Sequence, residues 1–101
     1  MIIYNVTLNV DESIHLEWLE WMKSTHIPDV LATGQFIGSK IFKLLTPAPE
    51  VGVTYAIQYS LKSLDDLEKY QREFSDKLQK ETIERYAGKF HAFRTVLETV
   101  D

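Results

Sequence analysis

Residues 2–10 read Ile2-Ile3-Tyr4-Asn5-Val6-Thr7-Leu8-Asn9-Val10. The even-numbered positions are all apolar or aromatic, and the odd-numbered positions from residue 5 onward are polar. Successive side chains of a β-strand point to opposite faces of the sheet, so this period of two predicts a strand. One face of the strand would be apolar and buried, and the other would be mostly polar.

Three further segments are predicted to be strands. Residues 51–61 alternate as clearly as residues 2–10, whereas residues 35–46 alternate poorly and residues 90–100 carry apolar side chains on both faces. Two prolines within residues 46–50 exclude a ladder there, so this short segment is predicted to be the loop of a hairpin.

A helix is predicted after the first strand. We expect Asp11 to cap its amino end, Pro28 to end it and Gly34 to provide a left-handed stop after a further turn. Its apolar stripe consists of Ile14, Trp18, Leu19, Trp21 and Met22.

A second helix is predicted after residue 61. Ser63 and Asp66 form a capping-box pattern at its start, and Gly88 closes the segment. Ile83 is out of phase with the apolar stripe, which indicates a bend or a new helical turn near Glu81. That stripe consists of Leu64, Leu67, Tyr70, Phe74 and Leu78.

The predicted order is therefore β-α-β-β-α-β within a single domain, residues 1–101. Two β-α-β halves of similar length predict a ferredoxin-like α+β fold, with a four-stranded antiparallel sheet that carries both helices on one face. The other face would be bare and would display Phe93 and Leu97 beside the odd-numbered side chains of residues 2–10. A second copy of the chain would cover such a face, so we expect a homodimer that pairs sheet to sheet.

Composition excludes several classes of function. The chain has 101 residues, 45% of them hydrophobic, and a formal net charge of −4, which disfavours binding to nucleic acid or to an anionic membrane. It has no cysteine, which excludes disulfides, thiolate nucleophiles and iron–sulfur clusters. Neither a signal peptide nor an apolar membrane span is recognisable, so a cytoplasmic location is expected.

Four motifs together resemble a small bacterial family of unknown function in the dimeric α/β-barrel superfamily. They are Tyr4-Asn5-Val6-Thr7, Trp18-x-x-Trp21-Met22-Lys23-x-x-His26-Ile27-Pro28, Thr33-Gly34-x-Phe36 and Gly88-Lys89-Phe90-x-Ala92-Phe93-Arg94-Thr95. The resemblance implies a ferredoxin-like homodimer with pockets between sheet and helices. The superfamily includes antibiotic-biosynthesis monooxygenases and haem-degrading enzymes, but the family itself implies no established activity.

Five residues are candidates for a ligand-binding site between the first helix and the sheet: Tyr4, Trp18, Trp21, His26 and Arg94. His26 would act as an acid, a base or a hydrogen-bond donor, or would only bond nearby backbone. The tryptophans would hold a flat molecule, or would only fill the core. Arg94 would bind a carboxylate or phosphate, or would pair with a carboxylate at the sheet edge or across a dimer.

No metal ion and no cofactor are predicted. His15 and His26 are about 16 Å apart along a straight helix, and no His-x-x-x-His pattern is present. Two classes of function follow. One is a small-molecule binding protein for an aromatic or acidic ligand, with cofactor-independent, monooxygenase-like oxidation as its catalytic form. The alternative is a non-catalytic dimeric interaction or regulatory module.

Overall fold

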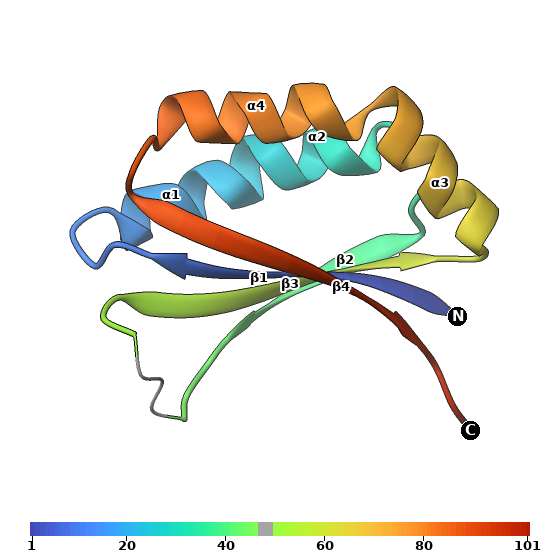
Figure 1. Cartoon of the computed structure of the whole chain (residues 1–101), viewed down its shortest axis with the longest axis horizontal. Coiled ribbons are helices and arrows are strands. Elements are labelled where there is room, and N and C mark those ends of the chain that lie inside the picture. The colour runs from blue at the N-terminus through green and yellow to red at the C-terminus, as the bar shows by residue number, and fades with distance from the viewer. Residues whose placement is uncertain (47–49) are drawn as a thin grey trace.

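The strand predicted at residues 2–10 lies inside a sheet with the strand order β2-β3-β1-β4. A computed structural model describes residues 1–46 and 50–101. The strands are β1 (Ile2–Val10), β2 (Gly38–Lys43), β3 (Val53–Leu61) and β4 (Phe90–Glu98). All helices lie over one face of this sheet (Figure 1). The predicted ferredoxin-like α+β fold is confirmed.

The pairings of the central strand β1 with β3 and with β4 contain no bulge. β1 pairs antiparallel with β3 from Ile2–Leu61 to Val10–Val53, and with β4 from Ile2–Glu98 to Val10–Phe90. The side chains of β1 that face the helices therefore lie on the same face of the sheet as every second side chain of β3 and of β4. The predicted hairpin of β2 and β3 is also confirmed. The predicted loop at residues 46–50 falls largely on residues 47–49, which lie outside the described residues.

The first helix begins later than predicted. Asp11 does not cap it: the Asp11 carboxylate accepts hydrogen bonds from the backbone N–H and the hydroxyl of Ser13, in the turn that precedes the helix. α1 (His15–Trp21) has Ile14 at its N-cap position and no side-chain cap. The predicted cap was wrong because Asp11 is four residues from the start of α1 and its carboxylate is occupied by the nearer Ser13.

The prediction that Pro28 ends the first helix is also wrong. α1 continues without a break through a π-helical segment, η1 (Met22–His26), into α2 (Ile27–Leu31). The N–H of Ile27 donates to the carbonyl of Met22, five residues earlier. Proline has no N–H, and its ring clashes with the carbonyl four residues before it in a regular α-helix. The wider π turn removes that conflict, because the chain reaches Pro28 with a different hydrogen-bond spacing.

The second helix is divided into α3 (Leu64–Glu73) and α4 (Ser75–Arg85). The predicted cap is confirmed, since the Ser63 hydroxyl accepts from the N–H of Asp66 at 3.3 Å. The bend or new helical turn predicted near Glu81 is wrong: the helix breaks at Phe74, whose φ is −129°, and α4 runs without interruption past Glu81. The Ser75 hydroxyl donates to the carbonyl of Gln71 at 3.0 Å, a contact that competes with helical bonding and bends helices.

Trp18 lies in the core between the helices and the sheet. Its side chain is fully buried, and its ring packs 5.0 Å from that of Tyr55 on β3. No helix in the described ranges is long and apolar enough to cross a membrane.

The face of the sheet opposite the helices is uncovered (Figure 1). Three large apolar side chains are exposed on it: Phe42 is 47% exposed, Phe93 60% and Leu97 44%. Asn5 lies between them, and its amide donates to the hydroxyls of Thr7 and Thr95. Its carbonyl oxygen is buried without a hydrogen-bond partner among the described residues. The bare face predicted from the sequence is present.

Trp18→Ala is expected to lower the free energy of unfolding by about 3–5 kcal/mol, because it leaves a large cavity in a packed core. Leu16→Ala is the matched control, since Leu16 is on the same helix but is 71% exposed. Its cost should stay below about 1 kcal/mol. Urea denaturation followed by circular dichroism measures both, and equal costs for the two variants would contradict the packing described here.

Candidate ligand-binding site

A cavity of about 190 Å³ lies between the sheet and the helices. The strands β1, β3 and β4 form its floor, and η1, α2, α3 and α4 form its roof. The floor residues follow from the strand register, because Val6 pairs with both Ile57 and Arg94 and all three therefore face the helices. Among the described residues that line the cavity there is no aspartate and no glutamate.

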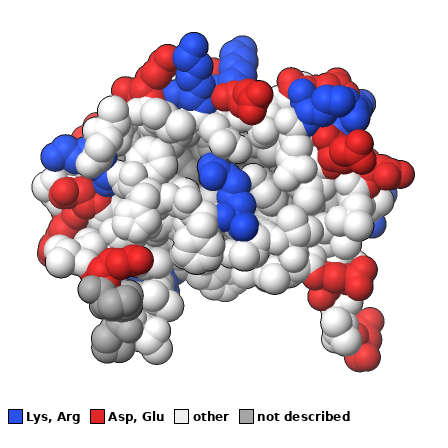
Figure 2. Space-filling view, viewed as in Figure 1, with Lys and Arg blue, Asp and Glu red and all other residues white. Residues whose placement is uncertain are grey.

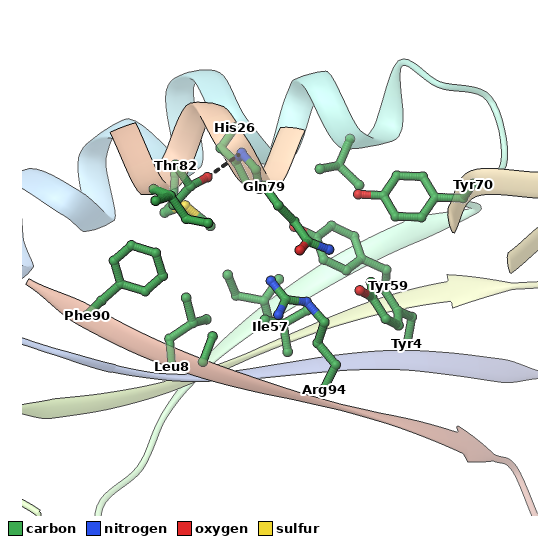
Figure 3. A pocket seen from close by; sticks show the side chains of 15 residues that line it. Tyr4, Leu8, His26, Ile57, Tyr59, Tyr70, Gln79, Thr82, Phe90 and Arg94 are labelled. Carbon is green, nitrogen blue, oxygen red and sulfur yellow. Dashed lines mark hydrogen bonds between the residues drawn. The ribbon is translucent and has the colours of Figure 1, made fainter. Parts of the chain in front are cut away.

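The cavity has a polar end and an apolar end. Tyr4, Tyr59 and Tyr70 lie at one end, and Leu8 and Phe90 lie at the other (Figure 3). Gln79 on α4 and Arg94 on β4 lie between them (Figure 3). A ligand with one polar group and an apolar body would therefore bind in one orientation, with its polar group at the tyrosine end.

Arg94 is the charged group of the cavity. It is exposed, and no described carboxylate lies within ion-pair distance of it, so the intrachain ion pair at the sheet edge is not formed among the described residues. It is the only lysine or arginine on β4. Figure 2 shows an isolated basic side chain in the middle of an uncharged surface where β4 runs in Figure 1. An unpaired guanidinium in such surroundings favours an anionic ligand.

The Tyr4 side chain has Arg94 as a hydrogen-bond partner, whereas no hydrogen bond to a described residue contributes to the pKa of Tyr59 or Tyr70. Burial raises the pKa values of Tyr59 and Tyr70, and it raises that of Tyr4 against the opposing effect of Arg94. The phenols therefore stay protonated near neutral pH and are available as donors. Phe36 holds two of them in place, with its ring 5.2 Å from that of Tyr59 and 4.8 Å from that of Tyr70.

His26 lies in the roof of the cavity, at the end of η1. Its ring stacks on Trp21 at 5.3 Å, and its Nδ1 lies 3.3 Å from the hydroxyl oxygen of Thr82 on α4. Burial lowers the pKa of His26 to about 4; the nearby Asp29 opposes this shift, and Arg94 adds to it. The imidazole is therefore neutral at pH 7, and Arg94 carries the positive charge of the cavity alone.

The structure brings three of the five predicted site residues together. Tyr4, His26 and Arg94 line the cavity, whereas Trp18 and Trp21 do not. Trp18 fills the core, and Trp21 supports His26 from the side away from the cavity. The guanidinium carbon of Arg85 lies 5.4 Å from the centroid of the Trp21 ring.

Sequence reasoning missed four polar residues of the cavity: Tyr59, Tyr70, Gln79 and Thr82. Tyr59 could have been found, because it shares an alternating pattern with Tyr4 and the two residues are directly paired. Tyr70 belongs to the apolar stripe of the second helix, where its hydroxyl gives no separate signal. Nothing in the sequence distinguishes Gln79 or Thr82 from the other polar residues of α4.

The size of the cavity limits what it can hold. A cavity of roughly 150 Å³ accommodates benzene, so about 190 Å³ fits one ring with a small substituent. A porphyrin or a flavin is several times larger. No group of three or more histidine, aspartate or glutamate side chains in the described part of the chain is placed to hold a metal ion.

The sequence model of one protein family, the domain of unknown function DUF4286, matches residues 1–100. The chain belongs to this family. No curated protein matches the sequence.

Solved structures with the same fold cover nearly the whole chain. An ethyl tert-butyl ether d (ethd) family protein from Bacillus halodurans C-125 is 16% identical with a TM-score of 0.71, over 99% of this chain and 100% of that one. A dimeric ferredoxin-like protein from an uncultured marine organism is 10% identical with a TM-score of 0.61, over 99% and 97%. A variant of MhuD with two manganese protoporphyrin IX molecules per active site is 16% identical with a TM-score of 0.62, over 99% and 95%. At these identities the likeness shows the fold alone.

The stability of the protein is expected to fall as the pH is lowered from 7 to 4. The unfolded imidazole of His26 takes up a proton near pH 6.5, whereas the folded one does so only near 4. Between these values the unfolded state binds more protons, so acidification favours unfolding, by roughly 2 to 3 kcal/mol in total. Urea denaturation at a series of pH values measures this slope.

His26→Gln should remove most of that pH dependence, and His91→Gln is the control because its side chain is 63% exposed. An unchanged slope in His26→Gln would show that other groups cause the loss of stability.

Proposed function

We propose that this protein binds a small organic acid, with one aromatic or apolar ring, in the cavity between the sheet and the helices. The observation that carries the proposal is Arg94: a guanidinium without an ion-pair partner in a cavity that no described acidic residue lines. A carboxylate would supply the missing partner. Hydrogen bonds to charged groups contribute about 1.5–3 kcal/mol each, which is enough for selective binding.

The rest of the cavity supports the same class of ligand. Tyrosine hydroxyls offer further donors for the anion at the polar end. The body of the ligand would lie against Leu8, Ile57, Phe90 and Ala92. Burying the apolar surface of a ring there would contribute roughly 25 cal/mol to the binding free energy for each Å² removed from water. A monocyclic carboxylate matches both the polarity and the volume of the cavity.

The bound porphyrins of the MhuD variant are not a guide to the ligand of this chain. A porphyrin exceeds the volume of about 190 Å³, and the tetrapyrrole would need an opened cavity. We therefore assign the ligand from the side chains of this cavity and not from the shared fold.

The proposal includes self-association through the bare face of the sheet. Phe42, Phe93 and Leu97 expose apolar surface there, and the buried carbonyl oxygen of Asn5 has no donor within the described chain. A second copy would cover the apolar side chains and bring polar groups to Asn5. The dimeric ferredoxin-like protein among the structural neighbours supports this arrangement.

Arg94→Gln should weaken benzoate binding about ten- to a hundred-fold, because it removes the charged hydrogen bonds to the carboxylate. Titration of the protein with benzoate, followed by calorimetry and by amide chemical shifts, measures this. Arg72→Gln is the matched control: Arg72 is exposed on α3 and pairs with Glu68 and Glu73, away from the cavity. Equal affinity in the Arg94 variant would refute the proposed site.

Replacing Phe93 by lysine should convert the dimer into a monomer, because the charge would be buried in the interface. Leu16→Lys is the control, since it adds the same charge at an exposed position on the helical side. Light scattering coupled to gel filtration measures the mass of each variant. A wild-type monomer, or a Phe93→Lys dimer, would contradict self-association through the sheet.

A further inference from the structure

The roof of the cavity carries a polar pair that the anion does not use. Thr82 on α4 is buried, and its hydroxyl oxygen lies 3.3 Å from the carbonyl oxygen of Leu78 and 3.3 Å from Nδ1 of His26. The hydrogen bond between Thr82 and His26 is drawn in Figure 3. A hydroxyl has a single hydrogen, so it can donate to only one of these two neighbours.

The carbonyl of Leu78 decides which neighbour receives that hydrogen. A carbonyl oxygen only accepts, so its contact with Thr82 is a hydrogen bond only if the threonine hydroxyl donates to it. The threonine oxygen then accepts from Nδ1 of His26, which must carry a proton. This arrangement satisfies both contacts. The reverse arrangement would leave two acceptor oxygens facing each other.

A neutral imidazole with a proton on Nδ1 has its lone pair on Nε2. No described residue hydrogen-bonds to Nε2 of His26, and this atom is not among the polar atoms sealed from solvent. Since His26 lines the cavity, an occupant that reaches its ring finds an acceptor at Nε2. The polar groups Arg94, Tyr4, Tyr59 and Tyr70 instead offer donors.

We propose that the ligand carries a hydroxyl group as well as its carboxylate, and that Thr82 fixes His26 as the acceptor for that hydroxyl. The class of ligand is thus a small hydroxylated aromatic acid. This inference rests on the proposed function, because it assigns a second contact to a ligand of the same cavity. His26 is a specificity-determining residue in this view, and Thr82 is the positioning residue that holds its tautomer.

The ligand class is tested with benzoate, 3-hydroxybenzoate and 4-hydroxybenzoate. One hydroxylated acid should bind about five- to ten-fold more tightly than benzoate, which is the size of one net hydrogen bond. Thr82→Val is nearly isosteric but cannot accept from Nδ1, so it should abolish this preference: both hydroxybenzoates should then bind no more tightly than benzoate does to the same variant. Thr82→Ser keeps the hydroxyl and should retain the preference.

A second measurement needs no ligand. Nitrogen-15 chemical shifts of the His26 ring at pH 7 should show a protonated Nδ1 and an unprotonated Nε2 in the wild type and in Thr82→Ser. Thr82→Val should shift the proton toward Nε2. A purely structural role of Thr82 in packing α4 would change stability but would not move these shifts.

The outcomes separate the two proposals. If benzoate binds but neither hydroxyl improves affinity, or if Nε2 is protonated in the wild type, the second contact is refuted while the anion site stands. If no acid binds, the proposed function fails together with this ligand class. A hydroxyl preference that persists in Thr82→Val would assign the contact to a tyrosine or to Gln79 and refute the role of His26.

Discussion

The unbroken pairing of β1 with both of its neighbours is the constraint on which the cavity depends. Because no bulge interrupts either ladder, Tyr4, Tyr59 and Arg94 all point to the face that the helices cover. A shift by one residue in either pairing would send one of these side chains to the bare face, because the side-chain period of a strand is two. The register that buries the core therefore also assembles the polar end of the cavity.

The π-helical segment is the second element that shapes the site. It keeps the helix continuous past Pro28, so that His26 and α2 stay over the sheet. A regular α-helix would end before the proline, and the roof of the cavity would end with it. π segments within α-helices are frequently found at functional sites, which agrees with the position of His26 against the cavity.

The positive charge of the cavity and its neutral hydrogen-bonding imidazole come from two different residues. Arg94 and His26 are both basic, but only Arg94 carries charge at pH 7, since burial keeps His26 neutral. The positive charge of the exposed Arg94 selects for an anion, and the neutral imidazole in the roof avoids the cost of a buried cation. Trp21 and Thr82 hold that imidazole from outside the cavity and from α4.

The order of strands and helices, the apolar face of β1 and the bare opposite face could all be predicted from the sequence. These follow from local periodicity, which depends only on neighbours along the chain. The sequence also indicated Tyr4, His26 and Arg94, because a titratable or charged residue among apolar ones is unusual. Three features could be seen only in the folded chain. Trp18 and Trp21 lie outside the cavity, and the helix continues past Pro28. The polar side chains that line the cavity together with Tyr4, His26 and Arg94 are those of Tyr59, Tyr70, Gln79 and Thr82. Those features depend on strand register and helix packing between segments far apart in the chain, and no local pattern encodes them.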